Sequence, residues 1–343
     1  MPALTPTFVM DLESRMRVIQ ENEHLRLTKN LWWTMLAKVF KTEFKREIVT
    51  WVLNTAQLDD MGDGGNIAFD NMTMQDHEFR HGVAGKGLKI RRQQFEDLDG
   101  NGVQLAAEWS AQIGAQNAYW PQKQTVNVLK NGEDATKFKG YDGLALFANN
   151  HPLNPKRPGV GTYSNLITGV PIDDFTNNIT TDVALKNLAS VFAAIASVKM
   201  PNGVDPRFLR PKAIICSPKL FPRLVQLTSA KFLAQAAASG GGSGDVEKLI
   251  AALGYGMPIM ADELVGFEGD TTYFVVTEVV TGTQLGSVVY IEREAFSTRY
   301  YTGRGGGNGV DAILDRADEL EWHNSGRNGM GIGHPFGVFK CKQ

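Results

Sequence analysis

The longest helical pattern in the chain lies at residues 102–130 and reads GVQLAAEWSAQIGAQNAYWPQKQTVNVLK. Its apolar side chains recur three and four positions apart, which predicts one long helix with an apolar face. Pro121 falls inside this pattern. Because proline removes a backbone donor and clashes with the preceding turn, we expect it to interrupt and kink the helix. A helix of this length would form the spine of a domain.

Upstream of this helix, residues 1–47 are expected to form an amphipathic N-terminal arm. Glu23 interrupts its apolar stripe, whose members are Met16, Ile19, Leu27, Leu31, Met35 and Val39. The stripe is too narrow to make a domain by itself. We therefore expect the arm to lie across a neighbouring molecule.

Residues 48–92, between the arm and the helix, are expected to form a long, exposed, two-stranded excursion. They open with the β-rich run Ile48-Val-Thr-Trp-Val-Leu53 and continue through a glycine-punctuated stretch. The strand-like segments that follow contain few residues suited to a core, so their stability must come from packing elsewhere. We expect a partner chain to supply it.

The remainder of the chain divides into a loop, an α/β segment and a closing β segment. Asn-Pro and Pro-Gly pairs between residues 147 and 159 predict a surface loop and a boundary. Residues 172–293 alternate helical and β patterns, with helices expected from Thr181, from Ser217-Pro218 and at 245–253. The strand-like stretch at 294–343 is expected to pair back with the spine region, which makes one domain discontinuous.

Bulk composition narrows the classes of function. The 343 residues are 43% apolar, enough for two or more compact units. Lys and Arg number 35 against 37 Asp and Glu, a formal charge of −2, which argues against a chain whose main work is to grip nucleic-acid phosphates. Two cysteines, Cys216 and Cys341, cannot build a disulfide framework, and no apolar run approaches a membrane span. A soluble protein assembled in a reducing compartment is expected, without a membrane partner.

One motif suggests chemistry: His77-Glu-Phe-Arg-His81 is a literal H-E-x-x-H, which on a helix places two imidazoles for zinc beside a carboxylate, Glu78. Glycines follow it at once and the preceding stretch leans towards β structure. On a strand the two imidazoles would be about 13 Å apart, too far for one metal with bonds of about 2.1 Å.

Other patterns give no support for catalysis. The glycine clusters at 240–244 and 303–309 lack the lysine of a phosphate-binding loop and are interpreted as flexible loops. No nucleophile elbow, G-x-S-x-G, occurs. We therefore expect no catalytic, cofactor-binding or metal-ligating residue.

Two groups of side chains are candidates for contacts between subunits. The pair Trp32 and Trp33 offers large apolar anchors on an arm that has no core of its own. A short basic run at the end of the excursion comprises Lys86, Lys89, Arg91 and Arg92. The alternatives are core packing for the tryptophans and a solvated strand edge for the basic run.

Several strings carry a resemblance to a known family. They are Phe95-Glu-Asp, Tyr119-Trp-Pro121, Tyr141-Asp-Gly-Leu-Ala-Leu-Phe147, Asn150-His-Pro152 and Lys212-Ala-Ile-Ile-Cys-Ser-Pro218. In these strings and in the order of its segments, the chain resembles the Mu-like phage major head subunit family. The similarity covers residues 48–216 and extends more loosely to the C-terminus.

The resemblance implies an α+β fold of the Hong Kong 97 capsid type. Its expected parts are an N-terminal arm (1–47), an E-loop (48–92), a P-domain with the spine helix (93–171), an α/β A-domain (172–293) and a closing β segment of the P-domain (294–343). It also implies pentamers and hexamers that close into an icosahedral head around double-stranded DNA, with portal, scaffold and protease partners. Assembly would take place in the host bacterial cytoplasm, and the mature location would be the virion.

Some members of this fold class join an E-loop lysine to a P-domain asparagine of a neighbour. Here Lys86 or Lys89 and Asn324 or Asn328 are of the right types, although no motif selects them. Two alternatives to a phage head remain: an encapsulin-type nanocompartment shell that holds protein cargo, and a zinc hydrolase that uses the H-E-x-x-H motif.

Overall fold

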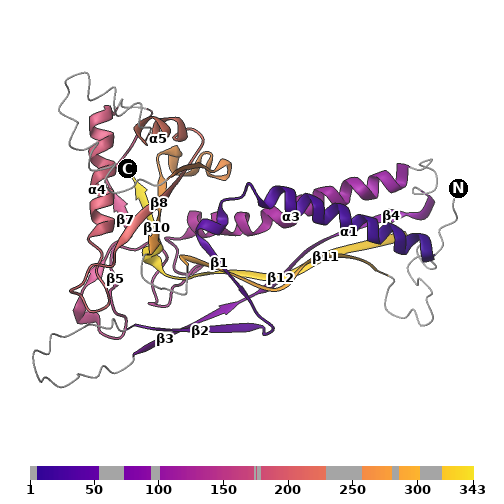
Figure 1. Ribbon diagram of the computed structural model, residues 1–343, viewed down its shortest axis with the longest axis horizontal. Helices are drawn as coiled ribbons and strands as arrows, with labels where there is room; N and C mark the ends of the chain where they lie inside the picture. The colour runs from indigo at the N-terminus through magenta and orange to yellow at the C-terminus, as the bar shows by residue number, and fades with distance from the viewer. Residues whose placement is uncertain are drawn as a thin grey trace, which may run out of the picture.

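The computed structural model describes residues 6–53, 73–93, 101–173, 175, 179–228, 257–279, 286–301 and 319–343. Within these ranges an elongated limb extends from a lobe at one end of the molecule (Figure 1). The limb contains two long helices beside long strands, and the lobe contains the second sheet with its shorter helices. The expected helix at 245–253 and both glycine clusters lie outside the described residues.

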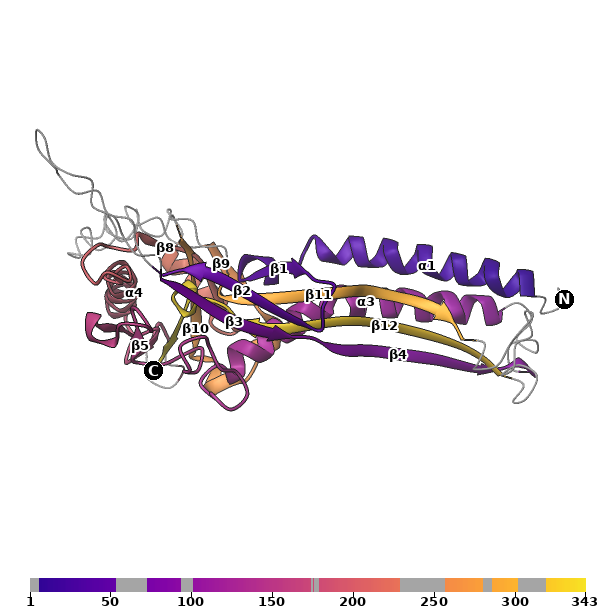
Figure 2. The same cartoon turned by 90° about the horizontal axis from the view of Figure 1, so that it is seen from below.

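The spine helix α3 spans Asn101–Asn131 and runs unbroken through Pro121, so the predicted interruption is wrong. Helix α1, Pro6–Thr28, lies beside it (Figure 2). They approach closely at Gly114, where an added Cβ would come within 2.5 Å of the Gln20 carbonyl oxygen. Only a residue without a side chain allows this crossing. The arm therefore packs on the spine helix of its own chain, whereas the sequence suggested a neighbour.

The limb is built on a four-stranded sheet in the order β1-β11-β12-β4. Its strands are β1 (Ala37–Lys41), β11 (Val288–Tyr300), β12 (Glu319–Ile332) and β4 (Gly82–Arg91). Helices α1 and α3 cover one face, where Met16 and Ala106 meet the buried side chain of Trp322. The closing β segment thus pairs back with the spine region, as predicted.

The excursion differs from the expected hairpin in its pairing. Strand β2, Arg46–Val52, pairs antiparallel with β3, Met74–Arg80, but the return strand β4 joins β12 of the limb sheet. The inner face of the β2–β3 ribbon also packs within the chain, through Val49 and Phe79 against Val289 and Ile291 of β11. Its described part therefore has support from its own chain.

The lobe contains a five-stranded sheet in the order β7-β13-β10-β8-β9. The strands are β7 (Leu166–Thr168), β13 (Val338–Lys342), β10 (Tyr273–Val279), β8 (Leu209–Cys216) and β9 (Met257–Met260). Helices α4 (Thr181–Ala196) and α5 (Phe221–Thr228) cover one face. The other face joins the C-terminal end of α3 and the Trp33 region in a second cluster. Because both faces are covered, the middle of the sheet contains uninterrupted apolar runs at 213–216 and 273–276.

Capping residues in the sequence predicted the starts of the two lobe helices to within a few residues. Thr180 caps α4 by accepting a hydrogen bond from the Val183 amide, one residue before the expected start. Ser217 caps the turn before α5 through the Leu220 amide. Two short strands, β5 (His151–Pro152) and β6 (Thr162–Tyr163), form the loop that follows α3.

The expected boundaries at 171/172 and 293/294 do not coincide with the sheets. The lobe sheet takes β7 and β13 from outside 172–293. The boundary at 293/294 divides β11, which belongs as a whole to the limb sheet. Five 3-10 turns complete the described elements: η1 (Trp33–Met35), η2 (Pro158–Val160), η3 (Asp262–Leu264), η4 (Phe267–Asp270) and η6 (Pro335–Gly337). Within the described ranges, no helix is long and apolar enough to cross a membrane.

Candidate assembly surfaces

The tryptophan pair lies inside the chain. Trp32 and Trp33 are each 7% exposed and belong to the cluster that joins limb and lobe. Trp33 packs edge-on against Tyr290 at 5.4 Å, and the Trp32 amide donates to the Gln122 side chain of α3. The premise that this pair lacks a core of its own is wrong. A contact with another subunit stays a prediction for both residues.

The basic run lies on β4, the outer strand of the limb sheet, and just beyond it. Lys86, Lys89, Arg91 and Arg92 are all exposed. Lys89 pairs with Glu319 and Glu321 of β12, and its hydrogen bonds to these carboxylates raise the pKa of Lys89. One charge of the run is therefore used within the chain, and the role of the run between subunits stays a prediction.

The two asparagines considered for a crosslink are buried. Asn324 is 2% exposed and exchanges amide hydrogen bonds of 2.9 and 3.1 Å with Asn117 of α3, while it also accepts one from Gln20 of α1. Asn328 is 6% exposed and accepts a hydrogen bond from the Trp120 indole. Because both side chains are enclosed and engaged, neither is presented to a lysine of another subunit. The amides instead fasten the arm, the spine helix and β12 together.

The H-E-x-x-H motif lies on a strand, as its flanking residues indicated. His77 belongs to β3, its ring meets Phe79 edge-on at 4.7 Å, and burial lowers the pKa of His77. The Arg80 hydrogen bond lowers the pKa of Glu78, which also pairs with Arg46. The ring of His81 contacts the Phe44 carbonyl. The helix that the zinc hydrolase requires is absent at this motif, and the described residues contain no cluster of three or more potential ligands.

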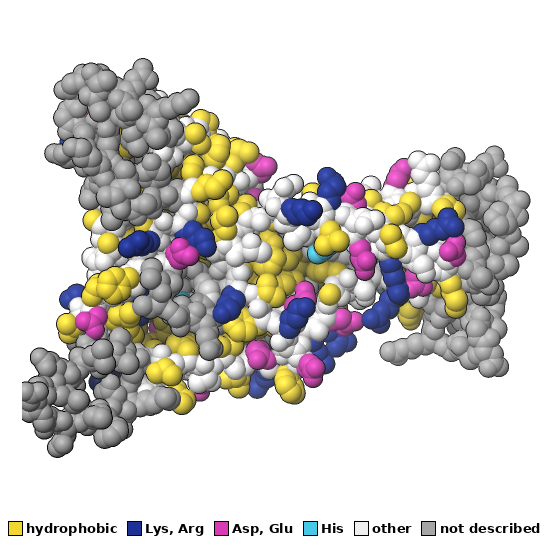
Figure 3. Space-filling model, viewed as in Figure 1, with side chains coloured by type: hydrophobic (Ala, Val, Ile, Leu, Met, Phe, Trp, Pro, Cys, Tyr) yellow, Lys and Arg dark blue, Asp and Glu magenta, His cyan; other side chains and the backbone are white. Residues whose placement is uncertain are grey.

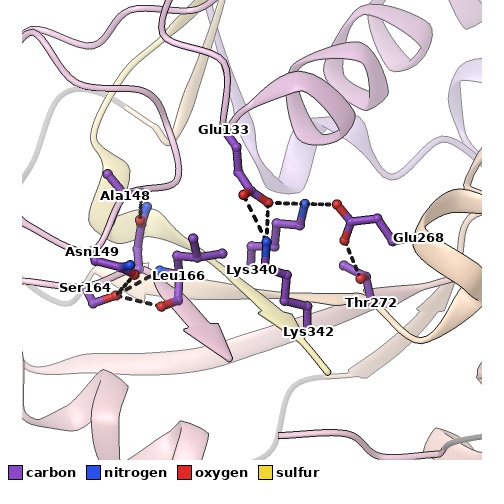
Figure 4. A network of polar contacts seen from close by, with 10 residues as sticks. Glu133, Ala148, Asn149, Ser164, Leu166, Glu268, Thr272, Lys340 and Lys342 are labelled. Atoms are coloured by element: carbon purple, nitrogen blue, oxygen red, sulfur yellow. Dashed lines mark hydrogen bonds and ion pairs between the residues drawn. The ribbon is translucent and has the colours of Figure 1, made fainter. Parts of the chain in front are cut away.

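An ionic network that sequence reasoning missed joins the end of α3 to the lobe (Figure 4). Lys340 of β13 is 1% exposed and donates to Glu133, just after α3, at 2.5 Å, and to Glu268 of η4. Lys342 also pairs with Glu133. Burial acts to raise the pKa of Glu133, but hydrogen bonds from the two lysines lower it overall. No local signal could have revealed this network, because each of its ion pairs joins residues that are 72 to 209 positions apart in the sequence.

Exposed apolar side chains occur on three parts of the described chain. They are Met10, Val18 and Leu25 on α1, Ile48, Val52 and Met74 on the outer face of the β2–β3 ribbon, and Val204, Met257 and Val265 at separate positions of the lobe. Each of these side chains is at least half exposed. Figure 3 shows apolar side chains on both the limb and the lobe. Such patches are typical of protein interaction surfaces.

Comparison with known families identifies one match. Residues 22–176 match the family "Mu-like prophage major head subunit gpT". This is a family of structural capsid proteins, not of enzymes. No curated protein sequence matches the chain.

Solved structures with a similar fold are phage capsids and a related particle. The capsid structure of the cyanophage P-SCSP1u is 13% identical, with a TM-score of 0.51 over 90% of this chain and 86% of that chain. The bacteriophage JBD30 capsid is 11% identical, with a TM-score of 0.46 over 90% of this chain and 64% of that chain. A virus-like particle from Pyrococcus furiosus is 9% identical, with a TM-score of 0.46 over 94% and 97%. The cyanophage match supports a mixed α+β fold of the Hong Kong 97 capsid type.

Proposed function

Because residues 22–176 match the Mu-like prophage major head subunit gpT family, we propose that the chain is the major capsid protein of a tailed phage or prophage. Its copies assemble into the icosahedral shell of the head, and the chain resides in the virion. The family match is the observation that carries this proposal. The likeness of the fold to a cyanophage capsid over 90% of the chain agrees with it.

In this proposal the shell is built from pentamers and hexamers that enclose double-stranded DNA. A single chain that contacts different patches on its neighbours makes heterologous interfaces, and such interfaces close into rings when the rotation between subunits permits it. The exposed apolar side chains of α1, the β2–β3 ribbon and the lobe supply such patches. Many modest interfaces then add to a stable shell, because each subunit is held at several places at once.

The parts of the chain take the roles that the family resemblance suggested. Residues 48–92, the E-loop, reach over a neighbour, with the exposed apolar face of the β2–β3 ribbon as the contact. Residues 172–293, which supply most of the lobe, form the A-domain and meet their copies around the symmetry axes. Residues 93–171 and 294–343, which supply much of the limb, form the P-domain, and residues 1–47 form the arm. The intersubunit candidates Lys86, Arg91 and Arg92 lie exposed at the limb edge.

Other partners belong to the same proposal. A portal, a scaffold and a protease act on heads assembled in the host bacterial cytoplasm. A formal charge of −2 fits a wall that encloses DNA without gripping it tightly.

The experiment is expression of the chain, with its scaffold where one is required, followed by sedimentation of the particles and nuclease treatment. Megadalton particles from the expressed chain would support a shell. Particles of the same protein from phage-infected cells that protect double-stranded DNA from the nuclease would support a phage head. Particles that enclose a protein cargo and no nucleic acid would instead identify a nanocompartment. A monomer or dimer under all salt conditions would refute both kinds of shell.

A further inference from the structure

Three aromatic rings from distant parts of the sequence meet where the β2–β3 ribbon approaches the lobe. Trp51 lies edge-on to Tyr141 at 5.0 Å and to His334 at 5.2 Å, with interplanar angles of 83° and 86°. Tyr141 and His334 are themselves perpendicular at 5.7 Å. Edge-to-face pairs are favoured by the charge distribution of aromatic rings and depend on orientation. We call Trp51, Tyr141 and His334 the ring cluster.

Each ring comes from a different element. Trp51 belongs to β2, Tyr141 follows α3, and His334 lies between β12 and η6. The ring cluster therefore joins the ribbon to the segment after the spine helix and to the C-terminal chain as it enters the lobe.

A second layer supports His334 from the lobe. His334 stacks on Phe336 at 4.7 Å, and the Arg207 guanidinium lies 3.8 Å from the centre of the same Phe336 ring. Arg207 is 7% exposed, while the next residue, Phe208, is 55% exposed in a left-handed conformation with φ of 55°. That conformation is costly for a bulky residue. It accompanies a turn of the chain that buries Arg207 and leaves Phe208 outside.

The base of the ribbon contacts the body of the chain on its inner face. Val49 and Phe79 pack on Val289 and Ile291 of β11, and β3 also lies against Gly329 and Gly331 of β12. Trp51 lies two residues further along β2, faces the same way and packs against the edge of this apolar cluster. The base contacts hold one end of the ribbon, and the ring cluster adds a directional contact further along the strand that fixes its angle.

We propose that Trp51 is a positioning residue for assembly: the ring cluster sets the angle at which the β2–β3 ribbon leaves the body and meets a second copy of this chain. This inference rests on the proposed function, since the angle matters only when the ribbon contacts a neighbour. A ribbon held at one angle gives one curvature at each type of interface. A ribbon that pivots gives a mixture of curvatures.

The test compares Trp51→Ala and Trp51→Phe with the control Gln116→Ala, which changes an exposed position of α3 outside the ribbon. The first measurement is hydrogen exchange of residues 46–52 and 74–80 in the unassembled subunit. Trp51→Ala should accelerate exchange there by about tenfold, with β8 and β10 unchanged and Trp51→Phe intermediate. If Trp51→Ala fails to fold, Trp51→Phe alone serves, with a smaller acceleration expected.

The second measurement is the distribution of particle diameters by electron microscopy. The Trp51 variants should give mixed sizes, tubes or open sheets, while Gln116→Ala gives the wild-type distribution. Wild-type exchange in the ribbon, or uniform particles of wild-type diameter from the Trp51 variants, would overturn the inference. If the wild-type chain forms no particles, the proposed function fails and the assembly role of Trp51 falls with it, while the exchange data still decide whether the ring cluster holds the ribbon.

Discussion

At the scale of single residues, several charged and polar side chains are buried and hold distant parts of the chain together. Lys340 and the amide of Asn324 are almost completely enclosed, and each connects elements that are distant in sequence. A buried charge or amide is costly unless its partners are in place. These side chains therefore favour one arrangement of arm, spine and lobe over its competitors.

Lys340 and Lys342 allow a matched comparison on one strand. Lys340 is 1% exposed with two carboxylate partners, whereas Lys342 is 29% exposed and pairs with Glu133. Replacement of Lys340 by Met should lower the free energy of unfolding by roughly 3 kcal/mol, because it leaves carboxylates without their buried cation. Lys342→Met should cost less than about 1 kcal/mol. Denaturant titration of the two variants checks this, and equal losses would contradict it.

His334 predicts how stability depends on pH. Burial, assisted by the charge of Arg207, lowers the pKa of His334 from 6.5 to about 3. The unfolded chain therefore takes up a proton below pH 6.5 that the folded chain refuses. The stability that the neutral, buried His334 contributes is fully present above pH 6.5 and is lost as the pH falls towards 3. Between pH 6.5 and 5 this group should cost roughly 1.5 kcal/mol of stability.

The variant His334→Gln removes that proton uptake. Its stability should fall less steeply than that of the wild type between pH 6.5 and 5, whatever its absolute stability. Thermal melts across this range measure the two slopes, and parallel slopes would contradict the assignment.

Sequence reasoning at this scale succeeded where local chemistry decides and failed where tertiary contact decides. The residues that flank the H-E-x-x-H motif correctly predicted a strand. The cap at Ser217 was predicted, and the cap of α4 is Thr180, one residue before the predicted Thr181. Core packing of Trp32 and Trp33 was one of two alternatives, and the sequence could not decide between them, because the apolar stripe of the arm gave no indication that the end of α3 would help to cover them.

At the scale of elements, the arm and the spine helix depend on one close crossing. Gly114→Ala in an ordinary exposed helix would raise stability by about 1 kcal/mol, because alanine is the better helix former. Here the new methyl group would lie 2.5 Å from the Gln20 carbonyl oxygen and force α1 away from α3. We expect a loss of about 1–3 kcal/mol instead. Gln116→Ala, at an exposed position of the same helix, is the control and should change stability by less than about 0.5 kcal/mol.

Strand β3 carries the second prediction at this scale. Because its backbone is extended, His77 and His81 do not form a zinc site. Protein purified without chelators should contain far less than one zinc per chain by mass spectrometry, and His77→Ala should not change that content. Stoichiometric zinc that disappears in this variant would restore the hydrolase hypothesis.

The existence of most described elements was predictable, whereas their pairing was not. Apolar periodicity located α3, α4, β8 and β10, because each buries a face or a whole strand. Nothing in the local pattern indicated that β4 would leave β3 and pair with β12, or that β13 would cross to the lobe sheet. These pairings join residues far apart in the chain, and only the packed core selects them.

At the scale of the whole molecule, an elongated limb, a projecting ribbon and a separate lobe leave apolar side chains exposed on several sides (Figures 1 and 3). Exposed apolar surfaces of this kind are typical of interaction sites, and assembly into the proposed shell would bury them. The family landmarks at 119–121, 141–147 and 150–152 fall in the spine helix and the loop that follows it, inside the matched residues 22–176. Of the other two strings that carry the resemblance, 95–97 also falls inside the matched residues, and 212–218 lies beyond them.

The most direct test of the head-subunit proposal is cryo-electron microscopy of particles formed by the purified chain. The account predicts closed shells with fivefold vertices and sixfold faces, in which the β2–β3 ribbon of each subunit lies on a neighbour. Particles without such vertices, or a chain that stays monomeric or dimeric under every assembly condition, would contradict it.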